Sequence, residues 1–200
     1  MKSMIKDAAI LFVITLISGL LLGVVYEVTK EPIAVQQAKR KNEACKEVFQ
    51  DAVDFGALEL SAPEPMLGSG EKASATINDV SEARAENGAV LGYVLDITTH
   101  EGYNGDIQFT MGIRMDGTVN GISLLSIAET PGLGMKAEEV LKPQFEGKNV
   151  NLFMYTKTGS MSPDQIDAIS GATITTNAVV NGVNAGLEFF KTELGGGKNE

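Results

Sequence analysis

The chain has 200 residues, a formal net charge of −10, one cysteine and one histidine. A chain of this length suits one domain with an appendage, and its acidic charge argues against nucleic-acid binding, which requires a basic face. Because Cys45 is the single cysteine, the sequence excludes an intrachain disulfide and a four-thiolate metal site. The single histidine, His100, likewise argues against a histidine-rich metal or haem site.

The N-terminal segment is predicted to be a membrane anchor. Lys2 and Lys6 precede Ala8–Tyr26, which contains no charged residue. As a helix, this stretch would span roughly 28 Å at about 1.5 Å per residue, close to the hydrocarbon thickness of a bilayer. A cleaved signal peptide normally has an apolar region of about 7–15 residues and a small-x-small cleavage site, which Val24–Glu27 does not provide. We therefore predict an uncleaved single-pass anchor, with Tyr26 at the membrane interface.

Charges beside this anchor leave its orientation open. Lys2 and Lys6 favour an N-terminus on the cytoplasmic side, and only Lys30 opposes them close to the other end. A wider window includes Lys39–Lys41, which reverses the bias. A long downstream domain can also cross the membrane regardless of such charges.

Two connecting segments follow the anchor. Glu27–Asp54 is rich in alanine, lysine and glutamate and predicts a juxtamembrane helix that is broken only at Pro32. Cys45 lies in this helix, where we expect a buried thiol without a redox role, because no second cysteine or cluster of cations accompanies it. Gly56–Gly70 contains prolines, glycines and serines, which is typical of a linker or surface loop.

The next segments predict antiparallel strands. Ala89–His100 is expected to form a strand that ends in a polar turn, with a solvated His100. Ile107–Met115 alternates strictly, which is the period of a half-buried strand with its methionines in the core on one face. Asp116-Gly117 predicts a hairpin turn, and Val119–Leu125 continues the apolar pattern as the return strand.

Near the C-terminus, small and hydroxyl residues precede a helical pattern. Ser170–Thr176 is followed by apolar residues with the spacing of one helix face, at Val179, Val180, Val183, Leu187 and Phe190. Thr175 or Thr176 is suited to the N-cap or the first turn, where several backbone N–H groups have no partner. With Gly171 allowing close approach, this helix start could bind a phosphate group. The residues alone favour an ordinary helix cap over a phosphate site.

Three short patterns resemble the FMN-binding domain family. Ser170–Thr175 is similar to its flavinylation motif, in which FMN is esterified through its phosphate to the last threonine, here Thr175. Gly102–Ile107 resembles the glycine-tyrosine turn that opens the sheet in this family. Glu129–Gly134 matches the other hallmark loop, where a stiff proline and two glycines let backbone N–H groups converge on a planar or anionic group. Relatives often carry a histidine just before this loop, whereas this chain does not, which argues against proton transfer there.

The resemblance extends to the anchor and to Thr29–Ile33 beyond it. This combination looks like the G-subunit family of Rnf electron-transport complexes, a close relative of the C subunits of sodium-pumping NADH:quinone reductases. The resemblance implies a complex that passes electrons between reduced ferredoxin and NAD and couples this to sodium or proton transport. The chain would be a non-autonomous electron-transfer subunit of this translocase, with no catalytic acid or base and no metal. Three alternatives remain. The chain could be the C subunit of a sodium-pumping NADH:quinone reductase, a different extracytoplasmic flavinylated electron carrier, or a non-redox membrane-tethered binding or scaffold domain.

The resemblance also implies the site, the partners and the fold. FMN would be covalent at Thr175. The further contacts would be Glu129, Thr130, Gly132, Leu133, Gly134, Met135, Ser170, Gly171, Ala172 and Thr173. Expected partners are other membrane subunits, the bilayer, and an FAD-dependent FMN transferase that matures the protein. The soluble part would lie on the extracytoplasmic side of the cell (inner) membrane. The expected fold is α+β, divided into a cytoplasmic N-terminus (1–7), a transmembrane helix (8–27), a juxtamembrane helix (28–55), a loop or linker that starts the soluble part (56–88), an antiparallel-sheet FMN-binding domain with a C-terminal helix (89–194) and a flexible tail (195–200).

Overall fold

The computed structural model describes residues 2–58, 64–67 and 73–195. It divides into two compact units, Met1–Arg40 and Lys41–Glu200. The first helix, α1 (Lys2–Val48), begins in the first unit and ends in the second. The boundary between the units therefore lies within a helix.

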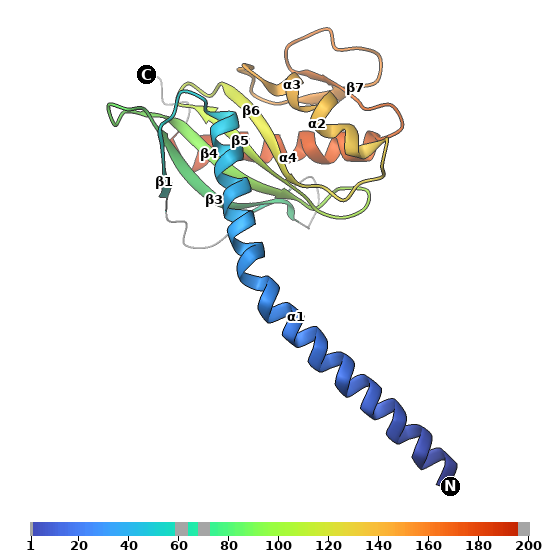
Figure 1. Cartoon of the computed structure of the whole chain (residues 1–200). Coiled ribbons are helices and arrows are strands. Elements are labelled where there is room, and N and C mark those ends of the chain that lie inside the picture. Colours follow the sequence, from blue (N-terminus) through green and yellow to red (C-terminus); the bar gives the residue numbers. More distant parts are fainter. Residues whose placement is uncertain (1, 59–63, 68–72, 196–200) are drawn as a thin grey trace. The chain divides into compact units, whose positions relative to one another are not determined.

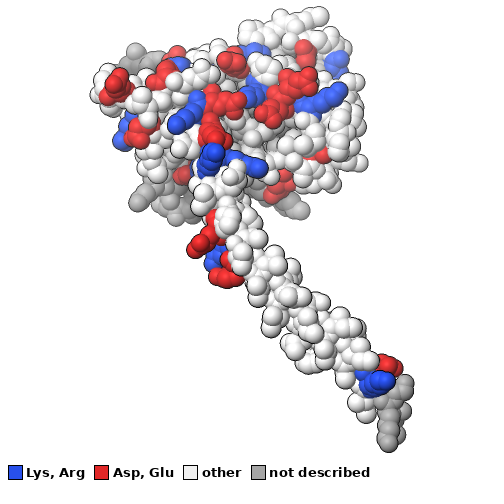
Figure 2. Space-filling view, viewed as in Figure 1, with Lys and Arg blue, Asp and Glu red and all other residues white. Residues whose placement is uncertain are grey.

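In the first unit, α1 has the properties of a membrane span. It is the one helix of the described chain that is long and apolar enough to cross a bilayer, and the most apolar part has no buried residue. Figure 2 shows this stretch as an uncharged surface between charged residues at its two ends. Apolar side chains on every side of a helix are unfavourable in water and suit a lipid environment. The structure thus supports the predicted single-pass anchor.

Two features of α1 differ from the expectation. The helix continues through Pro32, where a break was predicted, and it ends at Val48, whereas the prediction extended it to Asp54. A proline inside a helix removes one backbone hydrogen bond and strains one turn. Helix-forming residues on both sides of Pro32 keep the remaining bonds, so one missing donor does not end the helix.

The second unit is built on a six-stranded antiparallel sheet (Figure 1). Its strands are β1 (Asp54–Leu58), β2 (Glu64–Leu67), β3 (Ala73–Arg84), β4 (Val90–Thr99), β5 (Ile107–Arg114) and β6 (Val119–Ser126). Their order is β1-β3-β4-β5-β6, and β2 also pairs with β3. The predicted α+β class is confirmed, as are the strands around residues 89–100, 107–115 and 119–125.

The segment 56–88, expected to be mainly a loop or linker, instead contributes three strands. Parts of that expected loop, residues 59–63 and 68–72, lie outside the described residues. The longest strand, β3, is not evident from the sequence pattern because its pairing register with β4 shifts between Ile77 and Asp79. Such a shift exchanges the two faces, so Ile77 and Val80 both point into the core, and the alternation that marks a strand is lost.

The C-terminal helix α4 (Thr173–Thr192) covers one face of the sheet. It approaches closely through two glycines one turn apart. A Cβ atom at Gly182 would lie 2.9 Å from the Phe109 ring, and one at Gly186 would lie 2.7 Å from Met111 Sδ. The predicted apolar helix face is confirmed, because all five of its residues are buried.

The last turns of α1 and the residue after them cover the opposite face, which we call the outer face. Val48 and Phe49 pack directly against the backbone of Gly112, which has no side chain. A Cβ atom at Gly112 would come within 3.0 Å of Val48 and 3.1 Å of the Phe49 ring. Because both faces are covered, β5 is buried on both sides, and the expectation of a half-buried strand is wrong. Met111 lies in the core as predicted, but Met115 is exposed.

Polar contacts fasten this end of α1 to the outer face. Lys41 Nζ lies 2.7 Å from Asp79 Oδ2 and 3.2 Å from the buried Asp96. Burial alone would lower the pKa of Lys41, but hydrogen bonding and charge attraction from the two aspartates outweigh it and raise that pKa. Asn120 Nδ2 also donates to the carbonyl of Val48. The residues from Lys41 onward are therefore part of the folded domain.

The chain between the sheet and α4 forms a second layer. It contains a 3-10 turn η1 (Gly134–Lys136), α2 (Ala137–Val140), α3 (Lys142–Phe145), β7 (Met154–Thr156) and β8 (Gln165–Asp167). Strands β7 and β8 pair in parallel. Phe145 and Phe153 meet edge to face at 5.1 Å between ring centroids, which packs this layer onto the common core.

Candidate functional site

Within the described chain, the start of α4 leaves a cluster of backbone donors unpaired. Its first intrahelical bond runs from Thr176 N to Ala172 O at 3.0 Å. The N–H groups of residues 173–175 therefore have no intrahelical acceptor. Ala172 occupies the N-cap position without a side-chain cap. Thr175 and Thr176 both lie in the first turn, so the alternative that either of them is the N-cap is wrong.

Thr175 and Thr176 differ in the hydrogen bonds of their hydroxyl groups. Thr176 Oγ1 donates to Ala172 O at 3.0 Å and accepts from Ile169 N at 3.1 Å, so it ties the turn to the helix. The Thr175 hydroxyl has no hydrogen-bond partner within the described chain, although this residue is only 1 % exposed. Its oxygen still reaches the space beside the loop, since among the described residues Asp167 Oδ1 is the buried side-chain atom without a partner.

The Glu129–Gly134 loop lies directly against this hydroxyl. A Cβ atom at Gly134 would come within 2.7 Å of Thr175 Oγ1 and 2.6 Å of Glu129 Cβ. Only a glycine therefore lets the backbone approach the threonine so closely. At Gly171, in the left-handed region with φ 77°, a Cβ atom would lie 3.1 Å from Leu133 Cδ2. The loop and the motif meet at two glycines.

Glu129 connects the loop to the turn before β5. Its carboxylate is buried, and its Oε1 accepts hydrogen bonds from Tyr103 N at 2.7 Å and Asn104 N at 3.4 Å. Asn104 Nδ2 donates in return to Ala128 O at 2.7 Å. These contacts join segments about 25 residues apart and place Tyr103 beside the loop.

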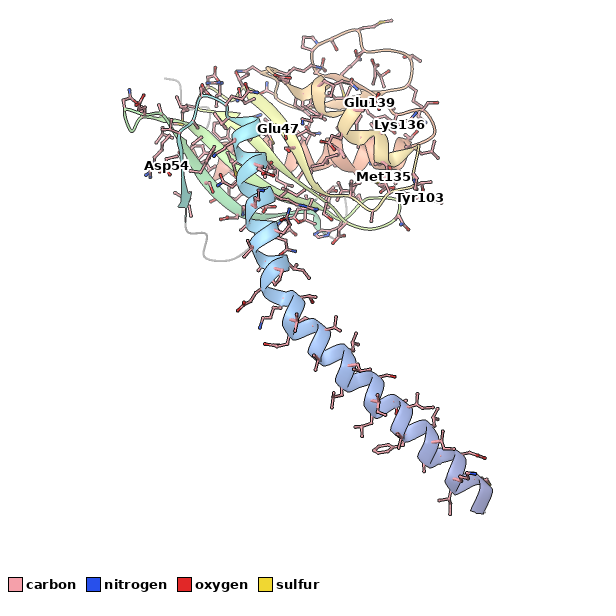
Figure 3. The ribbon with its side chains drawn as sticks, in the orientation of Figure 1. Glu47, Asp54, Tyr103, Met135, Lys136 and Glu139 are labelled. Carbon is pink, nitrogen blue, oxygen red and sulfur yellow. The ribbon has the colours of Figure 1, made fainter. Side chains whose placement is uncertain are left out.

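These segments border a cavity of about 460 Å³ that opens to the surface, and its volume is within the usual range for small-molecule and cofactor sites. Its lining consists of Tyr103, Glu129, Thr130, Leu133, Gly134, Gly171, Ala172, Thr173, Ile174 and Thr175. Figure 3 labels Tyr103 and Met135 at this end of the domain. No lysine or arginine is among the lining residues. An anion here would thus be held by backbone N–H groups and the helix dipole.

Most of the site residues expected from the sequence converge on this cavity. Gly132, Met135 and Ser170 do not line it. Tyr103 and Ile174 line it but were not expected as site residues. The glycine-tyrosine turn was the available signal for Tyr103, but its position depends on the distant Glu129. His100 is exposed at the end of β4 and contacts Thr76 and Asp106, away from the lining residues.

The cavity and the motif that borders it are compatible with FMN. The unpaired N–H groups suit a phosphate, the Thr175 hydroxyl is free for a covalent bond, and Leu133, Ile174 and Tyr103 offer apolar surface for a planar ring. This fit depends on the long-range contacts of Glu129 as much as on the motif itself.

Comparison with known proteins points the same way. Residues 102–188 match the FMN-binding domain and residues 1–48 the RnfG N-terminal region. The chain is 33% identical to the G subunit of the Na(+)-translocating ferredoxin:NAD(+) oxidoreductase complex of Acetobacterium woodii, over 95% of this chain and 93% of the relative. It is 30% identical to the G subunit of the ion-translocating oxidoreductase complex of Methanosarcina acetivorans, over 97% of this chain and 98% of the relative.

A solved structure supports the fold. NqrC of Shewanella oneidensis superposes with a TM-score of 0.51 and 19% identity, over 72% of this chain and 70% of that chain. At this identity the likeness concerns the fold alone. The resemblance noted in the sequence is confirmed by the matches over nearly the whole chain. The chain therefore belongs to the family of G subunits of Rnf-type ion-translocating oxidoreductase complexes, and residues 102–188 carry its FMN-binding domain.

Proposed function

We propose that this protein is the membrane-anchored flavoprotein subunit of an ion-translocating ferredoxin:NAD oxidoreductase, with FMN attached to Thr175 through a phosphoester. One observation carries the proposal. The Thr175 hydroxyl has no partner in the described structure and stands at a cavity beside three unpaired N–H groups, inside the segment that matches the FMN-binding domain. The names of the relatives supply the reaction class.

The attachment needs a separate enzyme, because a threonine hydroxyl is a poor nucleophile unaided. The donor would be FAD, supplied with an FAD-dependent FMN transferase. A bond forms between Thr175 Oγ1 and the FMN phosphorus, the pyrophosphate P–O bond of FAD breaks, and AMP leaves with the bridging oxygen. The hydroxyl proton passes to a base of the transferase. The remaining negative charge of the phosphodiester would lie at the helix N-terminus, where it is stabilised.

Once bound, FMN supplies the electron-transfer chemistry, and the residues of the chain position and tune it. Leu133, Ile174 and Tyr103 would offer apolar walls to the ring. Glu129 would hold the turn that carries Tyr103. The cradle around the phosphate and the flavin would be shaped by Thr130, Gly171, Ala172 and Thr173. Outside the lining, the backbone path of the two loops would be set in part by Gly132, Met135 and Ser170.

The proposed place of this domain is the extracytoplasmic side of the membrane. A covalent bond is useful there, because it replaces reloading from a cofactor pool with a permanently high effective concentration. The stretch Ala8–Tyr26 has no charged residue and offers no ion pathway. Ion transport would therefore belong to other membrane subunits, with this chain as their electron carrier.

The test is the intact mass of the full chain after co-expression with an FAD-dependent FMN transferase. We expect the parent chain to gain the mass of FMN less one water and to fluoresce on a denaturing gel, and Thr175→Ala to gain nothing. Thr192→Ala is the matched control, because it removes a threonine hydroxyl at the other end of α4, away from the cavity lining, and should keep the gain. Gain in Thr175→Ala would move the attachment elsewhere, and gain in no chain would reduce the motif to a helix start.

A further inference from the structure

Thr175 is poorly placed for the enzyme that the proposed function requires. The residue is 1 % exposed, and the cavity beside it holds about 460 Å³. Phosphoryl transfer places the attacking and leaving oxygens roughly in line on opposite sides of the phosphorus. The FMN phosphorus, the departing AMP and the groups of the transferase that bind them would all have to gather around Thr175 Oγ1. In the closed domain this approach is restricted by the backbone at Gly134, where a Cβ atom would lie 2.7 Å from Thr175 Oγ1.

We infer that FMN is transferred to Thr175 only while Glu129–Lys136 is lifted away, and that this segment closes over the finished ester. We call Glu129–Lys136 the cover segment. The inference rests on the proposed function and adds an order of events to it. In the closed domain, Thr175 can carry the finished ester but cannot accept FMN from the transferase.

The contacts of the cover segment fit this role. It meets the motif at the Gly134–Thr175 and Leu133–Gly171 approaches described above. In the described chain, no hydrogen bond joins the cover segment to residues 170–176. Lifting it away from the motif therefore breaks van der Waals contacts only, and leaves no buried polar group of the motif without its partner.

The segment also moves as one piece. Leu133 N and Met135 N both donate to Thr130 O, at 3.2 and 3.3 Å, and Lys136 N donates to Leu133 O at 3.0 Å. These bonds stay within the segment and need not break when it opens. Beyond it, Ala137 and Leu141 are buried and hold the following helices in the core.

At its N-terminal end, hydrogen bonds of Ala128 and Glu129, which we call the latch, tie the segment to the turn before β5. Glu129 Oε1 accepts from Tyr103 N at 2.7 Å, and Asn104 Nδ2 donates to Ala128 O at 2.7 Å. Hydrogen bonds to a charged group are among the stronger ones in proteins. The strength of this latch would then set how often Thr175 becomes accessible.

The experiment measures the labelling rate of the folded apo chain. The full chain is purified in detergent from cells that lack a transferase, then mixed with purified FAD-dependent FMN transferase and FAD, and the mass gain is followed over time. Glu129→Ala should label about tenfold faster or more, because it removes a charge-assisted hydrogen bond. Asn104→Ala should also label faster. Asn149→Ala is the matched control, since Asn149 Nδ2 likewise donates to a backbone carbonyl, at Asp116, remote from the cavity, and its rate should not change.

Backbone hydrogen exchange gives a readout that does not depend on the transferase. The Tyr103 amide, which donates to Glu129 Oε1, should exchange faster in Asn104→Ala because opening breaks this bond. In Asn149→Ala, its exchange rate and the midpoint of thermal unfolding should stay close to those of the parent chain. Faster exchange with an unchanged labelling rate would overturn the inference, because Thr175 would then be reached in the closed domain. A chain that gains no FMN in any variant, even during co-expression, would instead refute the attachment itself.

Discussion

The contact between Phe49 and the outer face is expected to decide the stability of the domain. In the sequence, Phe49 precedes residue 56, where the soluble part was predicted to start. Phe49 has no exposed surface, packs against Gly92 and Gly112, and lies with its ring 5.6 Å from the Arg114 guanidinium. Truncation of a buried phenylalanine costs about 3–5 kcal/mol. For a domain of this size, the change would lower the midpoint of thermal unfolding by roughly 6–20 °C at about 2–4 °C per kcal/mol.

The assay is thermal unfolding of the full apo chain in detergent, followed by near-ultraviolet circular dichroism, which reports on the folded domain and not on the helix of the anchor. Val53→Ala is the matched control, because Val53 is 64 % exposed and close in sequence. A fragment that begins at Lys41 should unfold like the full chain, whereas one that begins at Gly56 should not fold stably. Equal midpoints for Phe49→Ala and Val53→Ala would refute the claim that the end of α1 is part of the core.

Two further changes test the core and its charges. Gly186→Ala should destabilise the domain by about 1–3 kcal/mol, because the new Cβ atom would lie 2.7 Å from Met111 Sδ and 2.8 Å from Ile97 Cδ1; a chemical denaturation curve unchanged from the parent would contradict the close approach of α4. Burial alone would raise the pKa of Glu47, but hydrogen bonds from Lys142 and Ser123 lower it below its usual 4.5. The stabilisation from this contact is therefore present above pH 4.5 and is lost as the pH falls further. Glu47→Gln should flatten that part of the curve of stability against pH, and parallel curves for the two proteins would count against the contact.

Where local chemistry decides the structure, the sequence was a good guide. Asp116-Gly117 forms the expected hairpin turn, with Gly117 at φ 84° and Thr118 N bonded to the Asp116 side chain at 2.9 Å. The apolar stretch of the anchor and the apolar face of α4 also follow from periodicity alone. Each of these features depends on residues within one or two turns of one another, so their signals are complete in a short window.

Where distant segments decide, the sequence was a poor guide. Strand β3 was missed because its register shift hides the alternation, and its partner strand is needed to reveal it. The burial of β5 on both faces could not be predicted, since its second cover is the end of α1, which is distant in the sequence. The same long-range contact explains why the second compact unit begins as early as Lys41.

The site shows the same division. The sequence predicted the order of the two loops and the glycines that allow close backbone approach, and its resemblance to the family pointed to Thr175 as the proposed attachment residue. The tertiary structure decided that Gly134 lies against the Thr175 hydroxyl, that Thr176 is occupied by its own bonds while Thr175 is free, and that Glu129 brings Tyr103 to the cavity. Local sequence specifies backbone conformation through steric limits and hydrogen bonds within a few residues. Which side chains then share a cavity depends on the packing of the whole core, because a contact between distant segments forms only when every element between them is in place.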